Sequence, residues 1–294
     1  MSKMKIEIKN RWTGKILFEY ESTDNTIKKT VLAAIESDAD LGNADLSGAN
    51  LSGADLGNAH LRHANLNGAD LCNTDLGYAN LGDADVSYAN VRDADLNNAD
   101  LSKANLSYAK LCDANLRSAD LRYANLGYAD LRSANLSDAN LRNADLGNAN
   151  LRDAYMNNAD LRDANLRNAD LSDADLSDAA LSYANLGAAK LRLIKADFFL
   201  VLLWARNEVP ALKKALMDGR VNGSSVYVEE SDSLVGIIAN ARGCNYTQLK
   251  GITPDADNLS EQWFKGIRKG DAAETNPKVK IALEWIEEFE MLTK

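Results

Sequence analysis

A five-residue repeat runs through the middle of the chain and decides what it can fold into. Leucine stands at every fifth position from Leu41 to Leu191, with replacements only at Val86, Val91 and Met156. Alanine stands two residues before each of these positions with a single exception. Because a period of five fits neither an α-helix nor a β-strand, the segment is predicted to form a repeat architecture.

Each unit combines a short extended stretch with a turn. In extended backbone Ala39 and Leu41 point to one side and Asp40 to the other. The two residues after each leucine are small or polar, as in Ser47-Gly48, and such residues favour turns. One unit cannot bury its leucine alone, whereas stacked units can. Thr74 is the only replacement of the alanine.

The run ADLSGANLSGADL, from Ala44 to Leu56, resembles the pentapeptide-repeat proteins, and the resemblance covers residues 38–192. It implies a mainly β fold, a right-handed quadrilateral β-helix with four pentapeptides per coil. Residues twenty apart then stack on one face. The 31 units make about eight coils, roughly 37 Å long at the usual strand spacing.

The ends of such a solenoid are open sheet edges that need covering. Residues 1–37 predict an N-terminal cap, made of a β-hairpin with its turn at residues 12–14 and a helix capped by Asp24 or Asn25. Residues 193–294 hold all three prolines and predict a mostly helical C-terminal domain. Its predicted elements are a strand at 226–228, an apolar helix at 197–206, a helix between Pro210 and Gly219, one led by Ser231-Asp232 and followed by Gly243, one led by Ser260 and followed by Gly270, and one opened by Asn276-Pro277.

The negative charge belongs to the repeat segment. Residues 38–192 hold 23 Asp and no Glu against 13 Lys and Arg, so the segment carries −10, which equals the charge of the whole chain. Duplex DNA carries one negative charge per about 1.7 Å of its axis. The fluoroquinolone-resistance members of the family that the sequence resembles act on DNA gyrase as duplex mimics, and the resemblance implies a similar role here. Direct binding to nucleic acid is disfavoured, because like charges repel.

Stacking at intervals of twenty places Asp55, Asp75, Asp95 and Asp175 in one column, with Arg117 as the only flanking basic residue. This column is the candidate mimic surface. A structural explanation stays open beside it, because Asp and Asn side chains bond neighbouring backbone groups in turns.

A tyrosine ladder follows the same interval. Tyr88, Tyr108 and Tyr128 are predicted to stack on one outer face. As cross-strand pairs they stabilise the sheet, and as exposed aromatics they form a docking patch, so both roles stay open.

Arginines stack as well. Arg92, Arg132 and Arg152 form one column, and Asp93 and Asp153 follow two of them, so part of that face is expected to be internally paired. A second column holds Arg122, Arg142 and Arg162.

The chain offers little material for catalysis or metal binding. His60 and His63 are its only histidines, and they flank one corner while Cys72 lies on the opposite face. Cys72 and Cys112 lie two coils apart, about 9.6 Å, which is beyond disulfide reach. Cys244 has no histidine in its module. We therefore expect no enzyme, no cofactor and no metal site.

No apolar run is long enough to span a membrane, no signal-peptide core opens the chain, and the cysteine number is odd, so a cytoplasmic location is expected. The sequence predicts a non-enzymatic interaction protein, an acidic solenoid acting as a DNA mimic that inhibits or protects a DNA-binding enzyme. A topoisomerase or a phage-defence nuclease, in a bacterial or phage setting, is the expected partner. The alternative is a scaffold or assembly protein, with the solenoid as spacer and the C-terminal domain as partner-binding or homodimerisation module.

Overall fold

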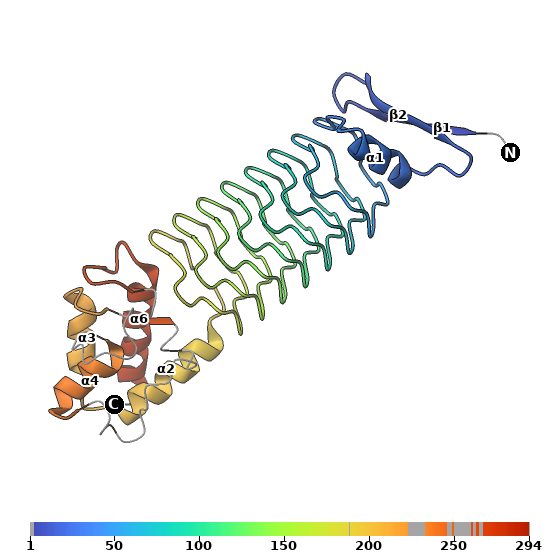
Figure 1. Ribbon diagram of the computed structural model, residues 1–294. Helices are drawn as coiled ribbons and strands as arrows, with labels where there is room; N and C mark the ends of the chain where they lie inside the picture. Colours follow the sequence, from blue (N-terminus) through green and yellow to red (C-terminus); the bar gives the residue numbers. More distant parts are fainter. Residues whose placement is uncertain are drawn as a thin grey trace.

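The computed structural model describes residues 3–187, 189–222, 233–245, 249, 260, 263–264 and 267–293. It is an elongated rod with a hairpin and one helix at its N-terminal end and a group of helices at its C-terminal end (Figure 1). The rod corresponds to the five-residue repeat.

Backbone pairing in the rod follows an interval of twenty residues. Parallel bridges join each position before a leucine to the residue twenty further on, from Asp45–Asn65 to Asp170–Lys190. Each side of a coil contributes a single bridge residue and forms no strand longer than that, because two of its five residues turn the corner. The predicted β-helix solenoid is therefore confirmed, with less strand than a mainly β fold suggests. Its right-handed sense and its number of coils stay predictions.

The inside of the rod is filled by the leucine and alanine columns, as in the fully buried Leu116, Ala119 and Leu121. The second residue of each corner adopts a left-handed backbone, with φ of 60° at Asn143. Gly and Asn tolerate this region best, which explains the small and polar corners. Tyr108 is held in the same region at φ 60° although a bulky side chain disfavours it.

The N-terminal cap consists of β1 (Met4–Lys9), antiparallel to β2 (Ile16–Ser22), and α1 (Ile27–Glu36). It covers the edge of the first coil, where the Asp45 amide donates to the Lys9 carbonyl over 2.8 Å. The predicted helix cap is wrong: the Thr26 side chain accepts from the Lys29 amide. Asn25 is buried instead, with its Nδ2 donating to the carbonyls of Met4 and Tyr20, so it is not free to cap α1.

The C-terminal helices begin where the repeat ends. They are α2 (Arg192–Trp204), α3 (Val209–Met217), α4 (Leu234–Arg242) and α6 (Pro277–Leu292). α2 thus starts earlier than predicted. Ser233, and not Ser231-Asp232, caps α4, because its side chain accepts from the Gly236 amide. Asn276 caps α6 as predicted. The strand expected at 226–228 and most of the helix expected after Ser260 lie outside the described residues.

These helices close the far end of the rod. The Tyr183 amide of the last coil donates to the Thr275 carbonyl over 2.9 Å. The core of the C-terminal helices is aromatic, with Phe198 packed 5.3 Å from Phe264 and 6.1 Å from Trp285 between ring centroids. In the part of the chain that the structure describes, no helix combines the length and the apolar character needed to cross a membrane.

Candidate interaction surface

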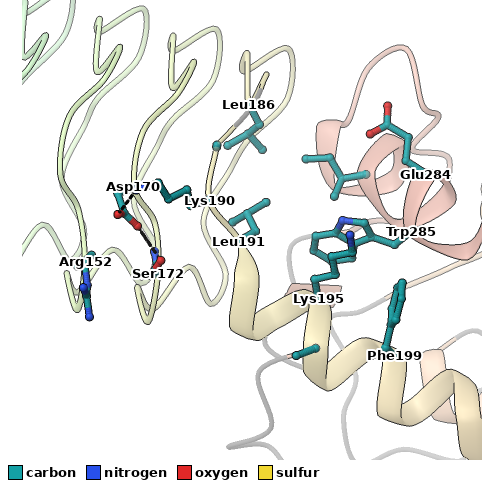
Figure 2. Close-up of a pocket in the computed structure, with 13 residues that line it drawn as sticks. Arg152, Asp170, Ser172, Leu186, Lys190, Leu191, Lys195, Phe199, Glu284 and Trp285 are labelled. Atoms are coloured by element: carbon teal, nitrogen blue, oxygen red, sulfur yellow. Dashed lines mark hydrogen bonds and ion pairs between the residues drawn. The ribbon is translucent and has the colours of Figure 1, made fainter. Parts of the chain in front are cut away.

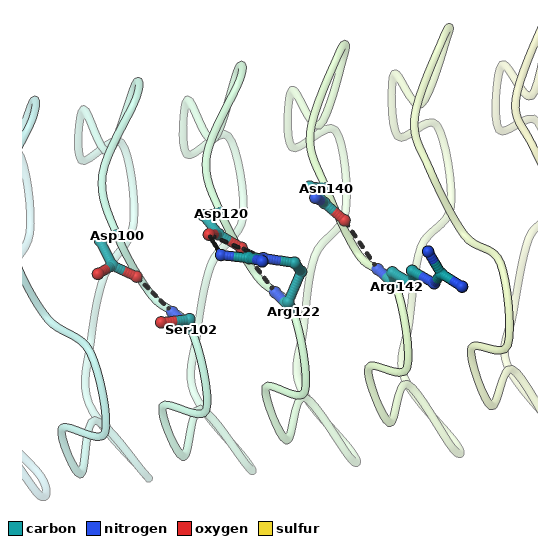
Figure 3. Close-up of polar contacts among 6 residues, drawn as sticks. All are labelled: Asp100, Ser102, Asp120, Arg122, Asn140 and Arg142. Carbon is teal, nitrogen blue, oxygen red and sulfur yellow. Dashed lines mark hydrogen bonds and ion pairs between the residues drawn. The ribbon is translucent and has the colours of Figure 1, made fainter.

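The aspartates and asparagines before the leucines hold the corners of the rod. At most of these corners Oδ1 accepts a hydrogen bond from the backbone amide two residues on, over 2.9 Å from Ser102 to Asp100 and 3.2 Å from Arg142 to Asn140 (Figure 3). At Asn90 the buried Oδ1 has no hydrogen-bond partner. The structural explanation of the aspartates is therefore correct for one carboxylate oxygen. The question of function concerns the other oxygen, Oδ2.

On two faces of the rod arginines engage these carboxylates. The guanidinium of Arg122 donates to both oxygens of Asp120, with Nε 2.8 Å from Oδ1 (Figure 3). Arg162 makes the same contact with Asp160, and hydrogen bonding to it lowers the pKa of that carboxyl.

The opposite face repeats the arrangement with Arg132, whose Nε lies 2.8 Å from Asp130 Oδ1. Hydrogen bonding to Arg132 lowers the pKa of Asp130. The partner thus stands two residues before the arginine. The pairing expected from the aspartates that follow Arg92 and Arg152 is wrong, since no ion pair of these arginines is found among the described residues.

A third face carries the column singled out from the sequence, and we call it the acidic face. Its bridge residues run Asp55, Asp75, Asp95, Asn115, Asn135, Tyr155 and Asp175. The first three aspartates are neighbours in consecutive coils, whereas Asp175 stands four coils beyond Asp95. Together with the two corner residues that follow each bridge residue, this face holds six Asp and one Arg, which is half of the net charge of the rod.

The carboxylates of the acidic column are not neutralised. Oδ1 of each serves its corner, as in the 2.8 Å bond from the Gly77 amide to Asp75. Across the described ranges, Asp55, Asp75, Asp95 and Asp175 form no ion pair. The only arginine of the face, Arg117, contacts a different carboxylate, with Nε 3.4 Å from Oδ2 of Asp138.

The tyrosine ladder stands on another corner of the rod. The rings of Tyr88, Tyr108 and Tyr128 are parallel within 3° and lie 5.0 Å apart between successive centroids. Their exposed fractions are 60%, 46% and 55%, so each ring edge faces solvent. The predicted stacking is present, and its use in docking stays a prediction.

Several grooves adjoin the rod, and two of them lie against helices at its ends. The larger, about 790 Å³, lies between the last coils and the helices α2 and α6 (Figure 2). Its apolar wall includes Leu191, Phe199 and Trp285. Its two lysines are engaged: Lys190 lies 2.8 Å from Asp170, and Lys195 lies 2.6 Å from Glu288.

The smaller groove, about 490 Å³, lies between α1 and the acidic face. Leu32, Ile35 and Glu36 of α1 form one wall. Asp55, Asp75 and Tyr78 of the rod contribute to the other. The α1 residues are site residues that sequence reasoning missed, because the repeat gives no signal of which face the preceding helix covers.

Metal and thiol chemistry gain no support from the geometry. Nowhere in the described residues do three His, Cys, Asp or Glu side chains gather as a metal site would require. His63 Nδ1 lies 4.0 Å from Asp83 at an exposed corner. Cys112 is buried, and burial raises the pKa of its thiol, which makes it a poor nucleophile.

Comparison with known proteins gives the following. The family model described as pentapeptide repeats matches eight copies over residues 39–77, 79–117, 114–153 and 154–192. No curated protein matches.

Among solved structures, HetL from the cyanobacterium Nostoc sp. strain PCC 7120, described as involved in heterocyst differentiation regulation, is 31% identical. The match covers 58% of this chain and 96% of HetL, with a TM-score of 0.25. Rfr23 from the cyanobacterium Cyanothece 51142 is 36% identical over 31% of this chain and 60% of its own, with a TM-score of 0.30. QnrB1, described as a plasmid-mediated fluoroquinolone resistance protein, is 21% identical. The match covers 54% of this chain and 82% of QnrB1, with a TM-score of 0.36.

Proposed function

The chain belongs to the pentapeptide-repeat family, and we propose that it is a non-enzymatic interaction protein whose acidic face binds a DNA-binding enzyme in place of duplex DNA. One observation carries the proposal. Asp55, Asp75 and Asp95 of the acidic column form no ion pair among the described residues, whereas Asp120, Asp130 and Asp160 on other faces are each held by an arginine. Aspartates without an ion pair occur on other faces too, as at Asp45 and Asp85, but on the acidic face three of them stand in consecutive coils and present a continuous run of charge to a partner.

The spacing of this charge suits a basic groove that binds DNA. One strand of duplex DNA presents a phosphate per about 3.4 Å of axis, and successive coils of the rod present a carboxylate per about 4.8 Å. The acidic face is therefore sparser in charge than DNA. Association is expected to be weaker than that of a DNA duplex and steeply dependent on salt.

The partner is proposed to be a topoisomerase or a defence nuclease that the rod inhibits or protects, in the cytoplasm and without direct contact to nucleic acid. The rod, the N-terminal cap at 1–37 and the C-terminal domain at 193–294 are proposed to act as separate modules, with the rod supplying the mimic surface.

A second candidate function rests on the C-terminal helices. Leu200, Leu203 and Trp204 of α2 share one side of the helix and are more than half exposed. Such a group of apolar side chains favours a scaffold that uses this domain to bind a partner or a second copy.

The test compares two variants that remove the same charge from different faces. Asn occurs naturally at this repeat position, so the substitutions keep the corner hydrogen bond. The acidic-face variant carries Asp55→Asn, Asp75→Asn and Asp95→Asn, and the matched control carries Asp45→Asn, Asp85→Asn and Asp145→Asn.

Each protein is immobilised and exposed to host lysate at low salt, and captured proteins are eluted with duplex DNA. We expect DNA-binding enzymes in the eluate, reduced about tenfold by the acidic-face variant and much less by the control. Equal capture by both variants would contradict mimicry by this face. Loss of capture only after Leu203→Glu on α2 would favour the scaffold.

A further inference from the structure

The groove between α1 and the acidic face has a floor in which two positions lack side chains. Gly57 and Gly77 occupy the same repeat position in neighbouring coils. A Cβ atom added to Gly77 would lie 3.0 Å from Asn97 Nδ2, so even a small side chain would fill the floor. Ser137 and Ser177 hold this position in later coils of the face, and they do not line the groove.

The lining of the groove is anionic. Glu36, Asp55 and Asp75 contribute carboxylates and no lining residue is basic. Lys28 of α1 uses its amine elsewhere, since Nζ donates to the Ser52 carbonyl over 2.5 Å. The three carboxylates do not meet in a set able to hold a metal ion, as judged over the described residues. The charge therefore favours an extended organic cation over a divalent metal.

The other walls match the remaining parts of an arginine side chain. Leu32 and Ile35 of α1 are half-buried and offer apolar surface to a methylene stem. Tyr78 lines the groove, is 62% exposed and makes no aromatic ring contact among the residues that the structure describes, so its ring is accessible to a planar cation. A guanidinium can stack on such a ring while donating to a carboxylate, which a lysine ammonium does less well.

We propose that this groove receives an arginine side chain of the protein partner, with the stem against α1, the guanidinium at Asp75 and its plane on Tyr78. The inference rests on the proposed function, because it names the chemistry by which a basic partner is anchored on the acidic face. It makes the N-terminal end of the rod the fixed point of the complex, while the rest of the column contributes long-range attraction.

The experiment measures the affinity of the full chain for two labelled probes, an oligo-arginine and an oligo-lysine peptide of equal length, by fluorescence anisotropy at low salt. We expect the arginine peptide to bind about fivefold more tightly. In Tyr78→Asn this preference should fall to about twofold or less. The variant keeps the corner, because Asn58 and Asn98 hold the same position in the coils on either side.

Two further variants sharpen the result. Gly77→Ser fills the floor and should weaken the arginine peptide more than the lysine peptide. Asp145→Asn removes one charge from another face and should leave the preference unchanged. Equal affinity of the two peptides for the unaltered chain, or a preference that survives in both Tyr78→Asn and Gly77→Ser, would overturn the proposal.

The outcome is separable from that of the proposed function. Loss of peptide preference in Tyr78→Asn supports the groove even if lysate capture is insensitive to the acidic face. Conversely, capture that depends on the acidic face with an unchanged preference in Tyr78→Asn keeps the mimic and removes the groove.

Discussion

Lys278 donates a hydrogen bond from its buried Nζ to the backbone carbonyl oxygen of Leu176, 3.2 Å away, and so joins the first turn of α6 to the last coils of the rod. The amine also lies 5.3 Å from the centre of the Trp263 ring. Burial lowers the pKa of Lys278 to about 7, although Asp175 and Asp178 act in the opposite direction.

This contact predicts a pH-dependent stability of the C-terminal helices. Between pH 7 and pH 10.5 the unfolded chain binds a proton at Lys278 that the folded chain does not, so stability should rise with pH in this window and stay low below it. Urea unfolding followed by tryptophan fluorescence measures the effect. Lys278→Met removes the titrating amine and should flatten the dependence of stability on pH. The Leu176 carbonyl keeps a partner in this variant, because it still accepts from the Ala179 amide. An identical slope in the variant would contradict the assignment.

The corner hydrogen bonds predict different effects for two substitutions at one site. Asp100→Asn keeps an acceptor for the Ser102 amide and should leave stability within about 0.5 kcal/mol. Asp100→Ala leaves that amide without its side-chain acceptor and should cost about 1 kcal/mol. Thermal unfolding compares the two. If both variants lose the same stability, charge and not turn geometry accounts for the aspartate.

The stacking of residues within the rod could be predicted from the sequence, because one five-residue pattern fixes every corner. The interval of twenty, once implied by the family resemblance, correctly places Tyr88 on Tyr108 and Asp55 beside Asp75. Each of these outcomes depends only on counting along the chain. The register therefore needs no knowledge of distant contacts.

Contacts that depend on side-chain direction or on the caps could not be predicted in this way. Arg132 donates to Asp130, two residues before it in the sequence, and not to a residue that follows it. Oδ1 of Asp130 already faces the corner on which Arg132 stands. Asn25 fails as a helix cap because the hairpin uses its amide, which only tertiary structure decides. The groove on the acidic face was missed for the same reason, since α1 and Tyr78 lie far apart in sequence.

The tyrosine ladder predicts a stability difference between two tyrosines in the same backbone conformation. Tyr108 and Tyr123 are both exposed at φ near 60°, and of the two only Tyr108 has ring contacts among the described residues. Asn suits this backbone at both sites. Tyr108→Asn should therefore be less stable than Tyr123→Asn by about 1 to 2 kcal/mol, the contribution of two stacked pairs. Equal stabilities would leave the ladder without a structural role and strengthen the docking interpretation.

Thr74, the one interruption of the alanine column, is predicted to be stabilised by its hydroxyl. The side chain is buried and Oγ1 donates to the Leu51 carbonyl over 3.1 Å. Thr74→Val keeps the volume and removes the hydrogen bond, and should cost about 1 kcal/mol in chemical denaturation. Leu51 keeps a partner in the Ala54 amide, so no larger loss is expected. A variant as stable as the unaltered chain would show that the hydroxyl is not needed.

The contrast between paired and unpaired carboxylates predicts that a single added arginine can neutralise part of the negative charge of the acidic face. Arg122 stands two residues after Asp120 and holds both of its oxygens. Asn97 stands at the same distance after Asp95, so Asn97→Arg should reproduce the pair. Folding should be unaffected, because the exposed pair contributes little to stability.

The control for this variant is Ser47→Arg, which adds the same charge two residues after Asp45 on another face. Both proteins have equal net charge, so a difference between them reports position alone. We expect Asn97→Arg to reduce low-salt capture of DNA-binding proteins several-fold more than Ser47→Arg, with the difference shrinking as salt is raised. If the two variants capture equally, the partner responds to the total charge of the rod and the column of the acidic face has no special role.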